Sequence, residues 1–288
     1  MSSTEIAEMR KQLNFFKSTL AAFSASSSNF RVLSTIPPAA GSSKPRPSTL
    51  YVLDSSFNPP TRAHLQIAKS ALTDDKGASP KRLLLLLATQ NADKAPRPAS
   101  FEHRLALMDI FAADLLRGMR EQKLEADELA VDIGVTKCPY FVDKAAAIQE
   151  SGTYEGSVEQ VHLTGYDTLI RIMNPKYYPP AHTLAPLEPF LSQHRLRVTY
   201  RTAADWGEQK EQDEYLRRIS DGERESEGAK KEWAERIVLV KGRQEGKQTI
   251  SSTKVRDAIK KGDQTELKTL ITDGVGQYIL EEEPYRDE

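Results

Sequence analysis

The sequence has almost no cysteine, no long hydrophobic segment and no excess of charge of either sign, and each absence excludes a class of protein. Cys138 is the single cysteine among 288 residues, which excludes an internal disulfide framework and a cysteine-rich zinc site. The longest apolar run covers Leu83–Ala88, whereas a helix that spans a bilayer needs roughly 20 apolar residues. Lysine and arginine total 40 against 41 acidic residues, so no global positive field attracts the chain to nucleic acids or anionic membranes.

The rest of the composition is that of an ordinary globular chain. Hydrophobic residues make up 39% of it, which argues against a disordered or fibrous protein. At roughly 100–200 residues per domain, the chain forms one large domain or two small ones. The first residues lack the basic region and following apolar segment of a secretory signal, so we predict none. Glu5 and Glu8 argue against a mitochondrial transit peptide, although the serine-rich N-terminus leaves that alternative open. We expect a soluble cytosolic or nuclear protein.

Residues 1–48 are predicted to form an amphipathic helix and a Pro/Ser-rich connector. Apolar side chains recur at alternating steps of three and four over residues 4–25, which predicts a helix with one apolar stripe. A serine cluster and a proline-rich segment follow the helix. The stripe favours docking on the main domain, and a role in homo-oligomerisation or in binding a protein partner is the alternative. The stripe comprises Ile6, Met9, Leu13, Phe16, Leu20 and Phe23.

From Thr49 the sequence alternates short apolar runs with helical patterns, which predicts one α/β domain over residues 49–288. Near-continuous apolar runs are typical of strands buried on both faces of a parallel sheet. We therefore predict a Rossmann-like, doubly wound, mainly parallel sheet with helices on both faces, whose ligands bind beyond the carboxyl ends of the strands. The predicted strands cover residues 50–53, 83–88, 129–135, 160–164, 196–200 and 237–240, and the predicted helices cover 62–72, 101–118, 142–149 and a short segment after Gly165.

Residues 205–236 interrupt this alternation with a segment that is dense in charge. The segment contains Trp206 and Trp233 but too few apolar residues for a buried helix. We predict a charged insertion with a solvated helix and a mobile loop, because charge runs usually form solvated faces.

The turn after the first predicted strand of this domain, residues 54–64, has the features of an anion-binding site. Small residues connect the strand to a helix, so backbone N–H groups and the helix dipole point at one place. Pro59 and Pro60 stiffen the turn. Thr61 is a candidate N-cap, and His64 lies over the same helical turn, where it can donate to a phosphate oxygen. A capped turn with a surface histidine is the alternative.

The same residues carry a resemblance to a known family. The run Ser-Ser-Phe-Asn-Pro-Pro-Thr-x-x-His resembles the G-x-F-x-P-x-[HT]-x-x-H signature of the nucleotidylyltransferase superfamily. Its form is most similar to that of the nicotinamide-mononucleotide and nicotinate-mononucleotide adenylyltransferases, and more specifically to a divergent fungal branch. The family usually has glycine at the position of Ser55. The resemblance implies ATP binding by Ser55, Ser56, Phe57, Asn58, Thr61 and His64.

A second motif, residues 250–256, lies roughly 190 residues further along the chain. Three hydroxyl residues open a helix there, and an arginine follows one turn later, which indicates a capped helix or a second anion site. The string Ile-Ser-Ser-Thr-x-x-Arg also resembles the other hallmark of the superfamily, which holds the β- and γ-phosphates of the nucleotide. The resemblance therefore implies ATP binding by Ser251, Ser252, Thr253 and Arg256.

The segments between the two motifs resemble the family less specifically. Gly165 and Asp167 follow a predicted strand and resemble the G-x-D that contacts the nucleotide, although an aspartate there is also an ordinary N-cap. Lys94 follows the second predicted strand of the domain, where the family places a lysine near the phosphates or the mononucleotide. His103 opens a long helix and is predicted to be structural.

The mononucleotide side departs from the family pattern, because no tryptophan follows the third predicted strand. The animal enzymes stack the nicotinamide ring with tryptophans. Aromatic side chains in the same region could provide a stacking face instead. The candidates for mononucleotide binding are Lys94, Thr136, Tyr140, Phe141 and Tyr177.

The resemblance implies an adenylyltransferase that joins ATP to a pyridine mononucleotide and releases pyrophosphate. The attacking phosphate is already anionic, so catalysis needs positioning and charge stabilisation by His64 and Arg256 rather than a general base. Magnesium would arrive on the ATP phosphates, because the sequence shows no carboxylate cluster suited to a protein-built metal site. The alternatives are a nucleotidylyltransferase or ATP-hydrolysing relative with another acceptor, and a non-catalytic nucleotide-binding scaffold acting through the segments 4–25 and 205–236.

Overall fold

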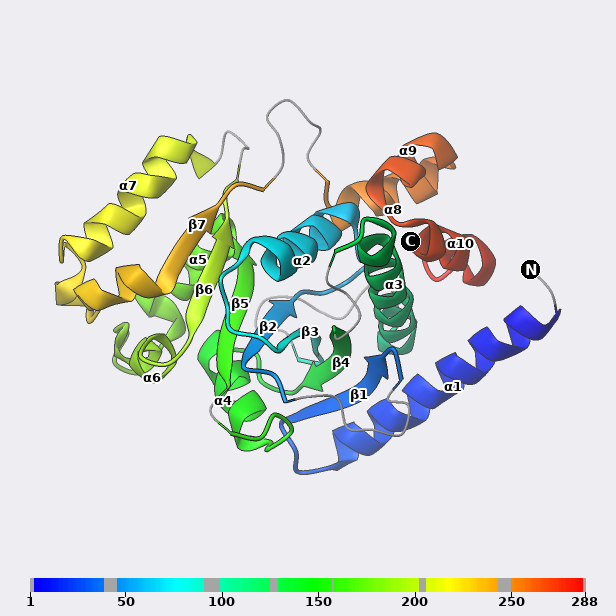
Figure 1. The fold of residues 1–288 in the computed structure, drawn as a ribbon, viewed down its shortest axis with the longest axis horizontal. Helices are drawn as coiled ribbons and strands as arrows, with labels where there is room; N and C mark the ends of the chain where they lie inside the picture. Colours follow the sequence, from blue (N-terminus) through cyan, green and yellow to red (C-terminus); the bar gives the residue numbers. More distant parts are fainter. Residues whose placement is uncertain are drawn as a thin grey trace.

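The computed structural model describes residues 3–38, 46–90, 99–124, 129–156, 158–201, 206–242 and 250–286. Its centre is a seven-stranded sheet with the order β1-β4-β3-β2-β5-β6-β7 (Figure 1). All neighbouring strands pair in parallel except β1, which is antiparallel to β4. The predicted mainly parallel α/β sheet is therefore confirmed. The strands are β1 (Phe30–Ile36), β2 (Thr49–Asp54), β3 (Lys81–Ala88), β4 (Ala130–Thr136), β5 (Glu159–Gly165), β6 (Arg195–Thr199) and β7 (Ile237–Val240).

Helices cover both faces of the sheet, because successive side chains of each strand point to opposite faces. Tyr51 and Leu53 of β2 pack in one hydrophobic cluster with α2 (Arg62–Asp74) and α3 (Phe101–Glu121), whereas Leu50 and Val52 pack in another with α4 (Phe141–Glu150). Another group of buried side chains, called the second hydrophobic cluster below, joins β6 to the helices α5 (Tyr166–Ile172) and α6 (Glu188–Leu191). The C-terminal helices α8 (Ser252–Lys261), α9 (Gln264–Leu270) and α10 (Asp273–Glu282) pack on the side of α2 and α3.

The order of the strands places the switch point of the sheet at the carboxyl end of β2. The chain runs outward from β2 through β3 to β4, and then returns to place β5 on the other side of β2. Ligands of doubly wound sheets bind at such a switch point, beyond the carboxyl ends of the strands. The loop after β2 holds the first predicted motif, and the end of β5 holds Gly165. The topology therefore brings both segments to one edge of the sheet.

The N-terminal helix α1 (Ser3–Ala25) lies along α3 and β1 (Figure 1). Phe16 and Phe23 are 1% and 0% exposed and belong to the main hydrophobic cluster, which confirms that the stripe docks on the domain. The role of residues 4–25 in oligomerisation or partner binding stays a prediction.

Strand β1 was not predicted from the sequence. Residues 30–36 lie between a serine cluster and a proline pair, within the range predicted as a helix and a connector, although Phe30, Val32, Leu33 and Ile36 are apolar. In the fold, Phe30 pairs with Thr136 and Ile36 pairs with Val131, so the strand forms an edge of the sheet. Tertiary hydrogen bonds hold it there: the Ser34 hydroxyl donates to Asp109 (2.8 Å) and the Thr35 hydroxyl donates to Asp132 (2.7 Å).

The charged segment contains the predicted exposed helix, α7 (Gln209–Ser220), and two short 3-10 helices in the loop that follows. The charged side chains of α7 lie in solvent, but Ile219 and Trp233 are buried against α5 and α6. Trp206 and Trp233 therefore belong to the second hydrophobic cluster. The 3-10 helices of the chain are η1 (Pro175–Tyr177), η2 (Ala185–Leu187), η4 (Glu225–Glu227) and η5 (Lys231–Arg236).

No helix in the described ranges is both long enough and apolar enough to cross a membrane.

Candidate nucleotide site

His64 occupies the first turn of α2, directly beyond the carboxyl end of β2. Its Nδ1 accepts a hydrogen bond from the backbone N–H of Thr61 (3.0 Å), and its Nε2 lies 2.9 Å from the Ser55 hydroxyl oxygen. A neutral imidazole carries one proton, so acceptance at Nδ1 places that proton on Nε2. The backbone of the turn therefore selects the tautomer whose Nε2–H points toward the loop after β2.

The surroundings keep His64 uncharged at neutral pH. Desolvation by the packed turn, and then the positive charge of Arg201, lower the pKa of His64 from its ordinary value of 6.5 to about 4. The Phe57 ring contributes to that packing, with its centroid 5.3 Å from the imidazole centroid. A neutral imidazole with its proton on Nε2 is a hydrogen-bond donor that does not titrate in the physiological range.

This pKa predicts a measurable titration and a stability window. The pKa values of His162 and His194 are also lowered, mainly by desolvation, so the assignment rests on a mutant: an NMR titration of the free protein should show a histidine ring that titrates near pH 4 and is absent in His64→Ala. The unfolded chain binds the proton near pH 6.5, so the stability contributed by neutral His64 is present above that pH and is lost as the pH falls toward 4. Five histidine signals that all titrate near 6.5 would contradict the assignment.

Most of the loop from Ser55 to Pro60 is buried. Phe57 has a φ of +44° and is fully buried, and Asn58 is 4% exposed, with its side-chain oxygen accepting from the N–H of Ala99 (3.4 Å). The left-handed backbone conformation occurs at Phe57 and not at Ser55. Ser55 therefore needs no positive φ, and serine fits the position where the family usually has glycine. Ser56 is exposed.

The second motif meets this loop directly. The Ser252 hydroxyl donates to the carbonyl oxygen of Pro59 (2.8 Å), and Arg256 donates to the carbonyl oxygen of Asn58 (2.9 Å). Ser251 is the N-cap of α8 and accepts from the N–H of Lys254 (3.2 Å). The first turn of α8 therefore abuts the loop after β2, and the structure brings together the two motifs that the sequence separates by roughly 190 residues.

Gly165 and Asp167 lie at the carboxyl end of β5, the strand next to β2. The Asp167 carboxylate accepts from Nε of Arg201 (2.6 Å), a residue just beyond the end of β6. A Cβ on Gly165 would lie 2.5 Å from that carboxylate and 3.0 Å from Nε of Arg201, so glycine leaves room for the pair. Sequence analysis did not single out Arg201, and its position directly after a predicted strand is the signal that could have found it.

The mononucleotide candidates have separate environments. The Thr136 hydroxyl donates to the carbonyl of Asn29 (2.9 Å) and accepts from the N–H of Cys138 (3.1 Å). Phe141 packs in the second hydrophobic cluster, with its ring centroid 5.0 Å from that of Phe190. Tyr140, the N-cap of α4, is 39% exposed.

The other two candidates are one residue in a 3-10 helix and one outside the described ranges. Tyr177 belongs to η1 and has the Lys176 ammonium 4.8 Å from its ring centroid. Lys94 lies outside the described residues. Mononucleotide binding by these five side chains stays a prediction.

An ion pair that sequence analysis missed joins the end of β2 to α4. Lys144 donates to Asp54 (2.5 Å), and both side chains are largely buried. Asp54 follows Val52 on the face that packs against α4, whereas Ser55 turns to the opposite side and contacts His64. The ion pair and the histidine contact therefore lie on opposite faces of the sheet. A lysine within a helical pattern carries no sequence signal for this contact.

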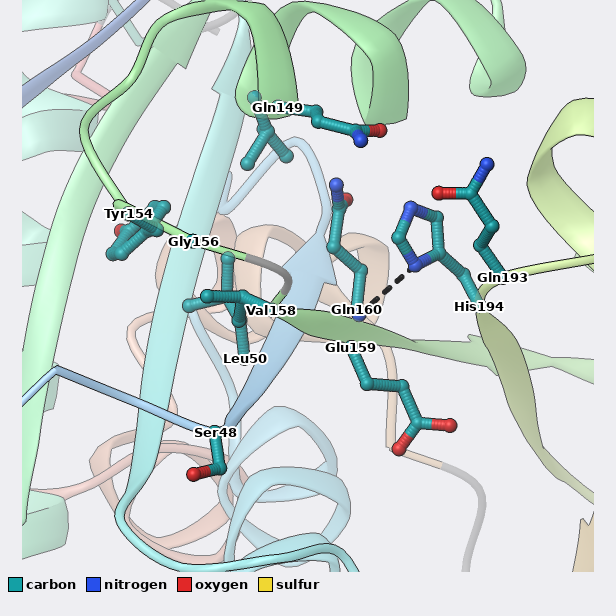
Figure 2. Close-up of a pocket in the computed structure, with 11 residues that line it drawn as sticks. Ser48, Leu50, Gln149, Tyr154, Gly156, Val158, Glu159, Gln160, Gln193 and His194 are labelled. Carbon is teal, nitrogen blue, oxygen red and sulfur yellow. Dashed lines mark hydrogen bonds between the residues drawn. The ribbon is translucent and has the colours of Figure 1, made fainter.

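A pocket of about 220 Å³ lies at the other edge of the sheet (Figure 2). Ser48, Glu159 and His194 line it, and they stand at the amino-terminal starts of β2, β5 and β6. The hydrogen bond from the Gln160 backbone N–H to Nδ1 of His194 (3.2 Å) closes part of its wall. This pocket is therefore separated by the length of the strands from His64 and both motifs.

The carboxyl edge of the sheet gathers hydroxyl groups, a neutral imidazole donor and two arginines at one place. Such a set fits an anion with several phosphate groups, because the donors approach from the loop after β2, from α8 and from the end of β6. The carboxylates at this edge, Asp54 and Asp167, each pair with a cation. Within the described ranges, no group of three or more His, Cys, Asp or Glu side chains could hold a metal ion.

Comparisons with known proteins show the family of the chain. No family model matches the chain. A Schizosaccharomyces pombe protein assigned as a nicotinamide mononucleotide adenylyltransferase is 34% identical over 237 residues, which cover 82% of this chain and 86% of that protein. The structure of Plasmodium falciparum nicotinic acid mononucleotide adenylyltransferase complexed with NaAD has a similar fold, with a TM-score of 0.51 at 13% identity over 84% of this chain and 98% of that chain. The same enzyme complexed with APC has a TM-score of 0.49 at 12% identity over the same shares. On the strength of the S. pombe relative, this chain belongs to the nicotinamide mononucleotide adenylyltransferase family.

Proposed function

We propose that the protein transfers AMP from ATP to nicotinamide mononucleotide or nicotinate mononucleotide, giving NAD or its deamido form and pyrophosphate. The observation that supports this function best is the contact between the two motifs, in which Ser252 and Arg256 donate to the backbone of the loop that carries His64. Family membership and a site rich in phosphate-binding donors support the same reaction.

In the proposed reaction, a phosphate oxygen of the mononucleotide attacks the α-phosphorus of ATP. The bond from that phosphorus to the bridging oxygen of pyrophosphate breaks, and pyrophosphate leaves with the electron pair. The nucleophile is already ionised, so no proton has to be removed from it. The protein contributes orientation and stabilisation of the charge on the phosphoryl oxygens.

The described residues divide this work between the two ends of the triphosphate. In the free protein, Nε2 of His64 contacts the Ser55 hydroxyl. When ATP binds, the Nε2–H donates to an α-phosphoryl oxygen in place of that contact. Thr253 is exposed at the start of α8, and Arg256 one turn later presents a fork of N–H groups, so both suit the β- and γ-phosphates. Thr61 is 1% exposed and contacts Nδ1 of His64, so we propose that it acts through the histidine.

Magnesium fits the site as an ion carried by ATP. Asp54 and Asp167 are engaged with Lys144 and Arg201, and neither belongs to a metal-binding cluster of described residues. Bound to the phosphate oxygens, Mg²⁺ would neutralise part of the charge that repels the incoming phosphate. We therefore expect a chelator to abolish turnover and added Mg²⁺ to restore it.

Pyrophosphate release from Mg–ATP tests the proposal. We expect release only when nicotinamide mononucleotide or nicotinate mononucleotide is present, with ATP alone and uridine monophosphate as controls. The ratio of kcat/KM for the two pyridine mononucleotides identifies the preferred acceptor. Equal release with ATP alone would indicate an ATP-hydrolysing protein, and release only with a different acceptor would overturn the assignment of the mononucleotide.

A further inference from the structure

Arg201 stands beyond the end of β6, and its guanidinium reaches back over the end of β5. Nε and Nη2 of Arg201 lie 3.0 Å from the position of a Cβ on Gly165, and Nε donates to the Asp167 carboxylate (2.6 Å). Strand β5 is the immediate neighbour of β2, whose loop carries His64. The guanidinium therefore lies over the strand next to the phosphate-binding loop, and its charge contributes to the lowered pKa of His64.

The backbone of Arg201 is held by a buried glutamine from the charged segment. The side-chain amide of Gln212 on α7 accepts from the N–H of Arg201 (3.1 Å) and donates to the carbonyl of Arg201 (2.6 Å). Gln212 is 0% exposed, although the charged residues around it on α7 lie in solvent. An amide that satisfies both the donor and the acceptor of one residue fixes that residue in place.

Helix α7 is itself anchored on the same edge of the sheet. Tyr215 of α7 meets the ring of Tyr166 edge-on, with centroids 6.0 Å apart, and Tyr166 lies between Gly165 and Asp167. Ile219, one turn further along, is buried in the second hydrophobic cluster. The helix therefore contacts the first residue of α5 through Tyr215, and it contacts Arg201, beyond the end of β6, through Gln212. Figure 1 shows α7 beyond β6 and β7, on the side of the sheet away from α1.

We propose that Arg201 binds a phosphate of the nucleotide and that Gln212 on α7 is the residue that positions it. The proposal rests on the proposed function, because it assigns the Arg201 guanidinium to the ATP phosphates. Arginine suits this role because its planar fork donates two N–H groups to phosphate oxygens. The Asp167 carboxylate keeps the guanidinium oriented at the end of β5 before the nucleotide binds.

Positioning by Gln212 lowers the ordering cost of that interaction. A residue on an unrestrained loop loses backbone and side-chain entropy when it binds a ligand. The backbone of Arg201 is already fixed by two hydrogen bonds, so less entropy is lost on binding. This gives the charged segment a role in the nucleotide site, although its composition indicates only a solvated surface helix.

A double-mutant cycle with Arg201→Met and Gln212→Met tests both parts of the proposal. The readout is calorimetric binding of Mg²⁺ with the non-transferable methylene analogue of ATP, which needs no mononucleotide and no turnover. Arg201→Met should weaken binding about tenfold or more, as expected for a hydrogen-bonded charge. Gln212→Met should weaken it in the original chain but add nothing in the Arg201→Met background, because the glutamine acts through the arginine.

Matched controls separate this role from a general loss of structure. Arg217 lies on the same helix and pairs with Glu214 and Asp221 in solvent, so Arg217→Met should leave binding unchanged. Arg201→Met should also raise the pKa of His64, an effect that a structural role elsewhere would not produce. If Gln212→Met fails to fold, Arg201→Lys provides the second arm, because it keeps the charge but loses the fork and should restore only part of the affinity.

Three outcomes would overturn the proposal. Arg201→Met binding within twofold of the original protein would remove Arg201 from the nucleotide site. Additive effects of the two substitutions would show that Gln212 acts independently of Arg201. Full recovery in Arg201→Lys would show that the fork is not used. Analogue binding with no mononucleotide-dependent pyrophosphate release would overturn the proposed function and leave the phosphate contact of Arg201 standing.

Discussion

Replacing His64 with alanine is expected to lower kcat by about 10²–10³-fold, the scale of losing one preorganised donor to a developing charge. The structure supplies the reason, because the Thr61 N–H occupies Nδ1 and leaves the Nε2–H as the donor that faces the loop after β2. In the proposed reaction, that donor stabilises the charge that develops on the α-phosphoryl oxygens. KM for ATP should change little, because the β- and γ-phosphates are assigned to Thr253 and Arg256.

Steady-state kinetics of pyrophosphate release measure this effect, and His64→Gln provides the matched variant. The glutamine side chain offers an amide N–H near the position of Nε2, so part of the lost rate should return. His103→Ala is the control histidine, because His103 contacts the Tyr278 hydroxyl (2.8 Å) at the packing of α3 on α10. A His64→Ala protein with an unchanged kcat would remove the histidine from the mechanism.

Replacing Phe23 with alanine is expected to lower the free energy of unfolding by about 3–5 kcal/mol, the usual cost of this substitution at a buried phenylalanine. Phe23 is 0% exposed at the end of α1, and the cations of Arg31 and Lys137 lie 5.8 Å and 5.1 Å from its ring centroid. Lys137 also donates to the carbonyl of Ser24 (3.2 Å), so the end of α1 is tied to the residue after β4. The substitution therefore removes both packing and two cation–π contacts.

Urea unfolding measures the loss, and Phe15→Ala is the matched control on the same helix. Phe15 is 47% exposed, so its truncation should cost less than about 1 kcal/mol. Equal effects of the two substitutions would contradict the packing of α1 on the domain. If Phe23→Ala also lowers kcat/KM for the mononucleotide more than for ATP, the end of β4 contributes to the acceptor side, as predicted for Thr136.

Much of the fold could be predicted from local patterns. The continuous apolar run at residues 83–88 predicted a doubly buried strand, and β3 covers Lys81–Ala88. The other five predicted strands agree with β2 and β4–β7 within one residue at each end. Strand β1 escaped prediction although Phe30, Val32, Leu33 and Ile36 are apolar, because it lies outside the alternation of strands and helices and takes its pairing from β4, a partner about 100 residues away.

Some residues of the candidate site could also be predicted from local patterns, and others could not. Thr61, His64 and Arg256 could be predicted as candidate nucleotide-binding residues, because helix caps and short motifs are local in sequence. Arg201, Gln212 and the Asp54–Lys144 pair could not be assigned roles, because their contacts join residues whose neighbours along the chain give no sign of the partner.

By itself, the sequence determined the α/β class, the positions of the two motifs predicted to bind phosphates, and the family resemblance. These depend on burial periodicity and on residue types at fixed short spacings, which a chain carries whatever its tertiary fold. The tertiary structure alone decided which imidazole nitrogen of His64 carries the proton, which carbonyl groups Ser252 and Arg256 bind, and that α7 holds Arg201 at the carboxyl edge. Those features depend on distances between segments that are far apart in the sequence, and only the packing of the sheet and its helices sets such distances.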